Sequence, residues 1–189
     1  VISVGRDSRL SGPRIRDAAV GALTARGVKV LDCGLASTPA MFMTTVDGGC
    51  DGAVQITASH HPFDRNGLKF FTAEGGLESE DVKEILTLAS EAPFPEKAGG
   101  SRIEKPYLDA YAQDLVEKVR RATGETQPLK GKRILVDAGN GAGGFYVDKV
   151  LKPLGADTTG SQFLEPDGRF PNHIPNPENE TAMRSVCEA

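Results

Sequence analysis

Short apolar runs alternate along the chain with segments in which apolar residues recur at helical spacing. In the first half, the apolar runs predict strands at residues 1–4, 28–34, 52–57 and 68–72. The helical spacing predicts a helix that begins near Ser11 or Gly12 and stops at Gly27, a short helix over residues 38–46, and a helix capped by Ser79. Because a helix separates the first two strands, they should be parallel and joined by a right-handed crossover.

The same order of elements returns in the second half of the chain. Residues 91–101 are rich in proline and glycine, so they are predicted to link two domains. The later pattern predicts an amphipathic helix, a strand, a glycine-bearing turn, a second helix and the start of a second strand, at residues 106–121, 133–138, 139–144, 145–154 and 156–162. This repeat predicts two related α/β domains, residues 1–97 and 98–189, with the second incomplete.

Composition and charge argue against several classes of protein. The net charge of −4 over 189 residues disfavours a general nucleic-acid or membrane-surface binder. No apolar run is long enough for a membrane helix, and the N-terminus lacks the apolar core of a signal peptide. The three cysteines show no CxxC spacing and are predicted to be free thiols in a reducing compartment, so a cytoplasmic location is expected: Cys33, Cys50 and Cys187.

The stretch TASHHPFDRNGLKFF, residues 57–71, is the first candidate site. Ser59 comes just after a predicted strand, where parallel α/β sheets usually place their sites. A serine hydroxyl is a weak nucleophile unless it is activated or already carries the group to be transferred. His60 and Lys69 could move protons or neutralise phosphate charge, whereas His61 is one residue farther away. The alternative is a polar turn with two surface histidines, which an isolated Ser-His pair usually is.

The arginines of GRDSR, residues 5–9, form a second candidate site. Arg6 and Arg9 follow the first predicted strand, so they should lie at the same sheet edge as Ser59. Arginine binds phosphate with two parallel hydrogen bonds, and the N-terminus of the following helix adds a favourable dipole. The alternative is that Asp7 simply pairs with a neighbouring arginine at the surface. Together with Ser59, the motif predicts a phosphate site.

Three glycines in the second half match a dinucleotide fingerprint, GxGxxG, but the context disfavours that function: Gly139, Gly141 and Gly144. The acid that should bind ribose belongs at the end of the next strand, whereas Asp157 falls near its start. A proline-rich segment then follows, so a tight strand-to-helix turn is predicted instead. His173, in that segment, has no partner that the sequence identifies. No metal-binding spacing and no GxSxG elbow occur.

Taken in order, these motifs resemble those of the α-D-phosphohexomutases, the phosphoglucomutases, phosphomannomutases and phosphoglucosamine mutases. TASHHP with NGLK resembles their phosphoserine loop, usually T-x-S-H-N-P, and GRDSR resembles their N-terminal arginine motif. VDAGNGAGG and PDGRFPNHIPNPE resemble the opening of their second domain. The resemblance spans nearly the whole chain and departs at His61, where asparagine is usual, which affects only the expected local hydrogen bonding.

The resemblance implies a phosphohexomutase mechanism. Ser59 would carry a phosphoryl group, pass it to a hexose monophosphate to give a bound hexose 1,6-bisphosphate, and take the other phosphate back. The phosphate on Ser59 would also be one ligand of Mg2+. Arg6, Arg9 and Lys69 would bind phosphate, with Lys69 and His60 as candidates for proton transfer. Positioning and positive charge are what phosphoryl transfer requires of a protein.

The resemblance also implies a larger protein of four domains. The expected fold is a three-layer α/β/α sandwich with a mixed sheet in domain I, residues 1–97, plus part of a similar domain II, residues 98–189. The metal loop would come beyond Ala189, so the fragment alone should be inactive, with the C-terminal domains of the same chain as its missing partners. The residues that select the sugar are absent. The alternative is a non-catalytic relative that binds or senses sugar phosphates.

Overall fold

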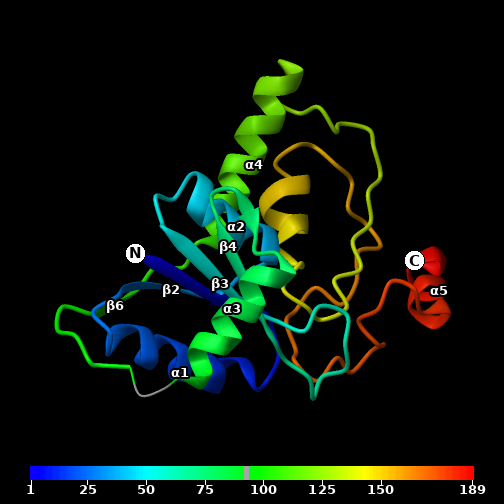
Figure 1. The fold of residues 1–189 in the computed structure, drawn as a ribbon. Coiled ribbons are helices and arrows are strands. Elements are labelled where there is room, and N and C mark those ends of the chain that lie inside the picture. Colours follow the sequence, from blue (N-terminus) through cyan, green and yellow to red (C-terminus); the bar gives the residue numbers. More distant parts are fainter. Residues whose placement is uncertain (92–93) are drawn as a thin grey trace. The chain divides into compact units, whose positions relative to one another are not determined.

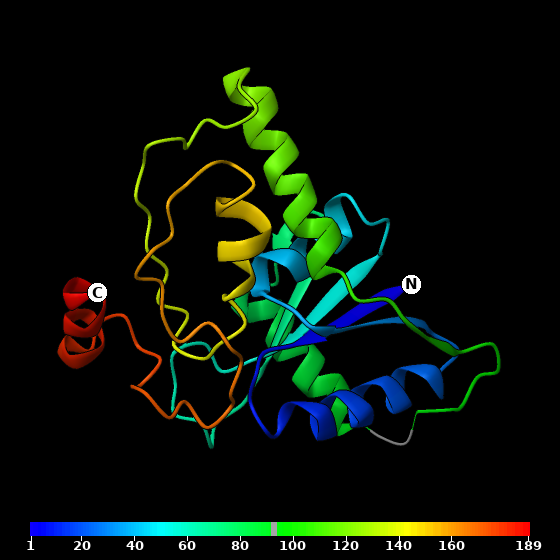
Figure 2. The same ribbon diagram turned by 180° about the vertical axis from the view of Figure 1, so that it is seen from behind.

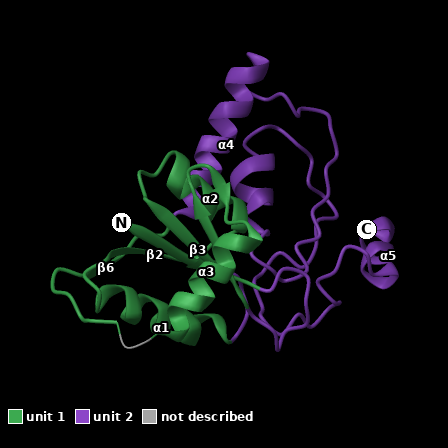
Figure 3. Cartoon of the chain, in the orientation of Figure 1, with its two compact units in different colours: residues 1–6, 11–57, 67–106 green, residues 7–10, 58–66, 107–189 purple. Residues whose placement is uncertain are grey.

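The computed structural model describes residues 1–91 and 94–189, so Ala92 and Pro93 of the predicted linker lie outside the described residues. The chain divides into two compact units, coloured in Figure 3. Unit 1 comprises Val1–Arg6, Ser11–Thr57 and Gly67–Pro106, and unit 2 comprises Asp7–Leu10, Ala58–Asn66 and Tyr107–Ala189. Two short loops from the first half of the sequence therefore belong to the second unit.

Unit 1 is built on a six-stranded mixed sheet in the order β5-β4-β3-β1-β2-β6 (Figure 1). Four strands are parallel: β1 (Ile2–Arg6), β2 (Lys29–Leu35), β3 (Gly52–Ile56) and β6 (Ser101–Glu104). The other two are antiparallel to their neighbours: β4 (Leu68–Thr72) and β5 (Gly75–Gly76). The four strands predicted in the first half are confirmed, and β5 and β6 are additions.

Helices cover both faces of this sheet. Helices α1 (Gly12–Thr24) and α3 (Ser79–Ser90) lie on one side and α2 (Thr38–Val46) on the other (Figures 1 and 2). This arrangement follows from topology, because β1 lies between β2 and β3, and right-handed crossovers in opposite directions place their helices on opposite faces. The predicted three-layer α/β/α arrangement is thus confirmed in this unit.

The start of α3 differs from the prediction by one residue. Glu78, rather than Ser79, is the N-cap, and it forms a capping box with Asp81. The Asp81 carboxylate accepts a hydrogen bond of 2.8 Å from the Glu78 backbone N–H, while the Glu78 side chain accepts one from the N–H of Asp81. The reciprocal bonds satisfy two backbone donors at once, an arrangement that a serine one residue later cannot make.

One hydrophobic cluster of unit 1 consists of branched aliphatic side chains from the sheet and α1: Val4, Val20, Val30, Val54 and Ile56. Burial of each such side chain contributes roughly 1.5–3 kcal/mol to folding. The three central residues of β1 are all buried. This burial agrees with the strand that the mostly apolar run of residues 1–4 predicted.

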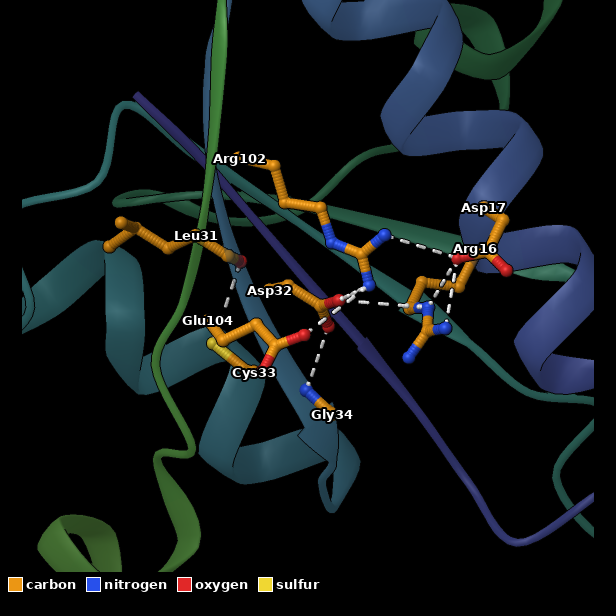
Figure 4. Close-up of polar contacts among 8 residues, drawn as sticks. All are labelled: Arg16, Asp17, Leu31, Asp32, Cys33, Gly34, Arg102 and Glu104. Carbon is orange, nitrogen blue, oxygen red and sulfur yellow. Dashed lines mark hydrogen bonds and ion pairs between the residues drawn. The ribbon is translucent and has the colours of Figure 1, made fainter.

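The edge strand β6 is fastened to the sheet by a buried carboxylate (Figure 4). Asp32 on β2 has a side chain only 3% exposed and accepts hydrogen bonds from Arg102 Nη2 at 2.6 Å and from the Gly34 N–H at 3.0 Å. Arg16 of α1 lies 3.6 Å away, and Asp17 bonds both arginines. The neighbouring Cys33 is a free thiol, and its burial raises its pKa to about 12.

Unit 2 contains the helices α4 (Leu108–Thr123) and α5 (Glu180–Glu188) and the π-helix η1 (Val147–Leu151). The amphipathic helix predicted near residues 106–121 is confirmed as α4, which ends at Gly124 in a left-handed conformation. Its apolar side contacts the η1 segment, and the buried residues of this core are Ala112, Val116, Val150 and Leu154. Within the parts of the chain that the structure describes, no helix has both the length and the apolar character needed to cross a membrane.

The two strands predicted in unit 2 run side by side in parallel, but only as isolated bridges. Asp157 is bridged to Arg133, and Gln162 is bridged to Asp137. The helix predicted over residues 145–154 contains η1, whose wider turn is closed by the bond of 3.0 Å from the Lys152 N–H to the Val147 carbonyl. Pro153 has no N–H to continue a regular helix, which accounts for the short element.

Candidate functional site

In unit 1, two of the predicted phosphate-binding residues, Arg6 and Lys69, lie at the carboxyl end of the sheet. Arg6 ends β1 and is in register with Ile56, the last residue of β3. Ile56 in turn pairs with Leu68 at the start of β4, and the exposed Lys69 follows it. Because β1 lies between β2 and β3, its end is a switch point, the place where α/β sheets bind ligands.

The serine loop leaves the sheet at this same end. Its base is closed by a hydrogen bond of 3.0 Å from the Thr57 N–H to the Gly67 carbonyl. Residues 58–66 lie between these two points, so a hydroxyl follows β3 as the sequence predicted.

In unit 2, the serine loop forms a tight turn. Ser59 is exposed and has a backbone φ of 56°, in the left-handed region that non-glycine residues rarely adopt. Its Oγ lies 3.4 Å from Nδ1 of the exposed His60, beyond the usual length of a hydrogen bond. The rings of His60 and His61 stack with their centroids 5.0 Å apart.

Arg9 lies against this loop and is fully buried. Nη2 donates to the Ser59 carbonyl at 2.9 Å and to the His61 carbonyl at 2.7 Å. Nη1 donates to the carbonyls of Pro62 and Arg65, and Nε donates to Asp7 at 3.0 Å. A phosphate role for Arg9 stays a prediction, and its donors would have to leave these acceptors to reach a ligand.

A second polar cluster in unit 2 joins His173 to Asp137. Nε2 of His173 lies 2.9 and 3.0 Å from the two carboxylate oxygens of Asp137, and Nδ1 lies 2.9 Å from the Ile174 carbonyl. Asp137 also accepts from the Gly139 N–H at 2.8 Å and from Gln162 Nε2 at 3.0 Å. This partner was not predicted from the sequence, although Asp137 stands near the end of a predicted strand, a usual position for functional side chains.

The His173 ring therefore faces an acceptor at each nitrogen. Only the doubly protonated imidazolium can donate to both at once. Burial disfavours the charged ring, but the hydrogen bond to the Ile174 carbonyl and the interaction with Asp137 outweigh it and raise the pKa of His173 above 6.5. The folded state consequently binds this proton more tightly than the unfolded chain does.

This proton linkage predicts a stability change with pH. Because the folded pKa is raised, the contribution of His173 is fully present below about pH 6.5 and is lost as pH rises through the folded pKa. Urea unfolding between pH 5.5 and 8.5 should show stability falling through this range, and His173→Gln should flatten the curve. The exposed His61→Gln serves as the matched control, and an unchanged slope in His173→Gln would contradict the prediction.

The glycine motif forms the tight turn that its context predicted. Gly139 has a φ of 50°, and a Cβ on Gly144 would lie 1.9 Å from the Leu164 carbonyl oxygen. Asn140 donates from Nδ2 to the Glu165 carbonyl at 2.9 Å and accepts from Asn172 at 2.7 Å. The turn thus binds the segment after residue 163 through its own backbone and amide groups.

Carboxylates, histidines and cysteines are not grouped for metal binding in the described part of the chain. No three of them are placed so that they could hold an ion together within residues 1–91 and 94–189. The polar clusters found are instead ion pairs and hydrogen-bonded loops.

Comparison with known proteins gives matches along both halves of the chain. The family model described as "Phosphoglucomutase/phosphomannomutase, alpha/beta/alpha domain I" matches residues 1–96, and the corresponding domain II model matches residues 105–189. A phosphoglucomutase of Neisseria gonorrhoeae is 35% identical over 189 residues, covering all of this chain and 39% of the relative. A phosphomannomutase of Escherichia coli is 36% identical, covering all of this chain and 42% of the relative.

Solved structures show the same similarity. A phosphoglucomutase/phosphomannomutase family protein from Burkholderia thailandensis superposes with a TM-score of 0.83 at 30% identity, over 98% of this chain and 40% of that one. A putative phosphomannomutase from Thermus thermophilus, at 22% identity and a TM-score of 0.74 over 96% of this chain and 41% of that one, shares the fold. The chain thus spans about two fifths of the length of the relatives it matches.

Proposed function

The chain belongs to the phosphoglucomutase/phosphomannomutase family, and on that premise we propose that it is the N-terminal part of a phosphohexomutase. Such an isomerase interconverts hexose 1-phosphates and hexose 6-phosphates. The observation that carries the proposal is the exposed Ser59, in a left-handed turn on a loop that leaves the carboxyl end of β3. Arg6 and Lys69 stand at the same end of the sheet and provide positive charge.

In the proposed reaction, Ser59 Oγ carries the phosphoryl group. The bond from phosphorus to Oγ breaks while a hydroxyl of the hexose monophosphate forms a new bond to phosphorus, giving the hexose 1,6-bisphosphate. The hydroxyl proton moves to Oγ by way of His60 or Lys69, the two groups that the resemblance gives as candidates for proton transfer. The reverse transfer of the other phosphate restores phosphoserine, while Arg6 and Lys69 offset the negative charge of the moving group.

A divalent cation belongs to the proposal, with a limited contribution from this chain. Mg2+ takes oxygen ligands and neutralises phosphate charge when it is bound. Among the described residues no three carboxylate, histidine or cysteine side chains are placed to hold an ion together, and the proposal assigns to this chain one ligand, a phosphate oxygen on Ser59. The remaining ligands are proposed to come from later domains.

The chain covers only 39% and 42% of two relatives, which supports the proposal that the active protein is a longer polypeptide whose domains each supply part of the site. We propose that C-terminal domains supply the metal and sugar loops, so that residues 1–189 alone have no mutase activity. Turnover of glucose 1-phosphate by the purified 189-residue chain, coupled to detection of glucose 6-phosphate, would contradict this part.

The test of the carrier role uses this chain within the full-length protein that the proposal implies. The protein is incubated with Mg2+ and glucose 1,6-bisphosphate, and the peptide that contains Ser59 is analysed by mass spectrometry. One phosphoryl group per chain on Ser59, absent from Ser59→Ala, is expected. An unmodified Ser59 in a folded protein would favour instead a non-catalytic protein that binds sugar phosphates.

A further inference from the structure

Arg9 is a buried cation whose hydrogen-bonding capacity is completely used. A guanidinium group has five N–H donors, and each of the five faces a protein acceptor. Four of these acceptors are backbone carbonyls of the serine loop, and one is the Asp7 carboxylate. Burial of an arginine is energetically costly unless its donors are satisfied. The folded state therefore requires these five hydrogen bonds.

These bonds act directly on the peptide that bears the candidate nucleophile. Ser59 has a φ of 56°, a conformation that a non-glycine residue keeps only when its surroundings hold it. Arg9 Nη2 binds the carbonyl of Ser59 itself and that of His61, and the His61 N–H closes the turn on the Ala58 carbonyl at 3.0 Å. The guanidinium thus fixes the peptide planes on the C-terminal side of Ser59.

Arg9 is held in turn from its other side, by the turn at residues 167–170. The guanidinium carbon lies 5.1 Å from the centre of the Phe170 ring, at cation–π distance. A Cβ on Gly168 would lie 2.3 Å from the Ser8 carbonyl oxygen and 2.7 Å from Arg9 Cα, so only glycine permits this approach. The turn is anchored by the bond of 2.8 Å from the Asp167 N–H to the Asn140 carbonyl.

We propose that Arg9 is a positioning residue, which holds the serine loop in its conformation without touching the phosphate. Residues 7–10, 58–66 and 167–170, here called the Arg9 cluster, all belong to unit 2. In this cluster the guanidinium orients the Ser59 peptide, and Phe170 with Gly168 keeps the guanidinium in place. The expected effect on phosphorylation of Ser59 rests on the proposed function, whereas the expected effect on the conformation of the serine loop does not.

The structural test uses limited trypsin digestion of the 189-residue chain. Arg65 is exposed, and its carbonyl accepts from Arg9, so the Arg65–Asn66 bond reports whether the loop is held. Cleavage there, normalised to cleavage after the exposed Arg121, should be at least about tenfold faster in Arg9→Met, the effect of losing one charge-assisted hydrogen bond. Arg9→Lys should also be faster, because one ammonium group cannot reach four separate carbonyls.

Controls separate loop release from general destabilisation. Arg14→Met removes an exposed arginine of α1, and Val20→Ala loosens the core of unit 1, and neither should accelerate cleavage after Arg65 selectively. If Arg9→Met does not fold, Phe170→Ala leaves the arginine present and should give a smaller increase at the same bond. Unchanged cleavage in a folded Arg9→Met or in Phe170→Ala would overturn the proposal.

The catalytic test uses phosphorylation of Ser59 in the full-length protein, with glucose 1,6-bisphosphate as the phosphoryl donor. If Arg9 is a positioning residue, Arg9→Lys should lower the rate of Ser59 phosphorylation at saturating glucose 1,6-bisphosphate by about tenfold or more. The concentration of glucose 1,6-bisphosphate that gives half of this rate should stay within about twofold of the wild-type value. A raised half-saturating concentration with an unchanged saturated rate would show direct phosphate binding and overturn the proposal. If wild-type Ser59 takes no phosphate, the proposed function fails, and trypsin digestion still decides the structural role.

Discussion

Alanine at position 59 is expected to abolish interconversion of hexose 1-phosphate and hexose 6-phosphate by the full-length protein. Turnover should fall by at least about 10⁴-fold, the scale on which loss of a covalent nucleophile acts, because the proposed reaction has no other phosphoryl carrier. The loop itself should keep its shape, since Arg9 binds the carbonyl of residue 59 rather than its side chain. A coupled assay of product formation, with trypsin digestion at Arg65 as the check of loop structure, measures both.

The matched control for Ser59→Ala is His61→Asn. His61 lies in the same loop, is exposed, and gives its backbone carbonyl rather than its ring to Arg9. Turnover of His61→Asn should therefore stay within a few-fold of the wild-type rate. Activity near the wild-type level in Ser59→Ala would mean that another group carries the phosphate, and a collapse of activity in His61→Asn would give the second imidazole a role in the reaction.

Gly144→Ala is expected to be the most destabilising small substitution in unit 2. A Cβ at this position would lie 1.9 Å from the oxygen and 2.7 Å from the carbon of the Leu164 carbonyl, so the two backbone segments must separate. The free energy of unfolding should fall by roughly 3 kcal/mol or more, at the upper end of what overpacking costs, because a backbone cannot move aside as a side chain can. Urea unfolding followed by circular dichroism measures the change.

The adjacent Gly143 provides the control for this prediction. A Cβ on Gly143 would meet no atom within 4 Å, and its φ lies outside the left-handed region. Gly143→Ala should therefore change the unfolding free energy by less than about 1 kcal/mol, in either direction. Equal losses in the two variants would show that backbone flexibility, rather than the contact with Leu164, is what the glycines supply.

The elements that the sequence predicted well are those whose residues interact with near neighbours. Strands β1 and β3 are mostly apolar and buried, and α2 begins at Thr38 after the Ser37 cap, with Pro39 in its first turn, so local chemistry was sufficient. Strand β6 was missed because three of its four residues are exposed, and it is held by pairing with β2 and by the Arg102–Asp32 ion pair. The strands expected in the second half became isolated bridges for the same reason, since pairing between strands is a property of the fold.

Sequence order alone determined the candidate site in its outline. Arg6 ends the parallel strand β1, Lys69 is near the start of the antiparallel β4 at the same edge of the sheet, and Ser59 follows β3 in the chain. The contacts of the individual side chains could not be obtained in this way, because their partners lie far away in sequence. Arg9 and the Ser59 carbonyl are 50 positions apart, and His173 and Asp137 are 36 positions apart.

For this protein, the sequence by itself determined the family, the α/β architecture of unit 1 and the serine that the proposed chemistry uses, since all three depend on local patterns and their order. Only the tertiary structure showed that the serine loop belongs to unit 2, that Arg9 donates hydrogen bonds to backbone carbonyls of this loop, and that Asp137 is the partner of His173. The physical reason is that a buried polar group must find hydrogen-bond partners wherever the folded chain brings them, and residue order does not specify that place.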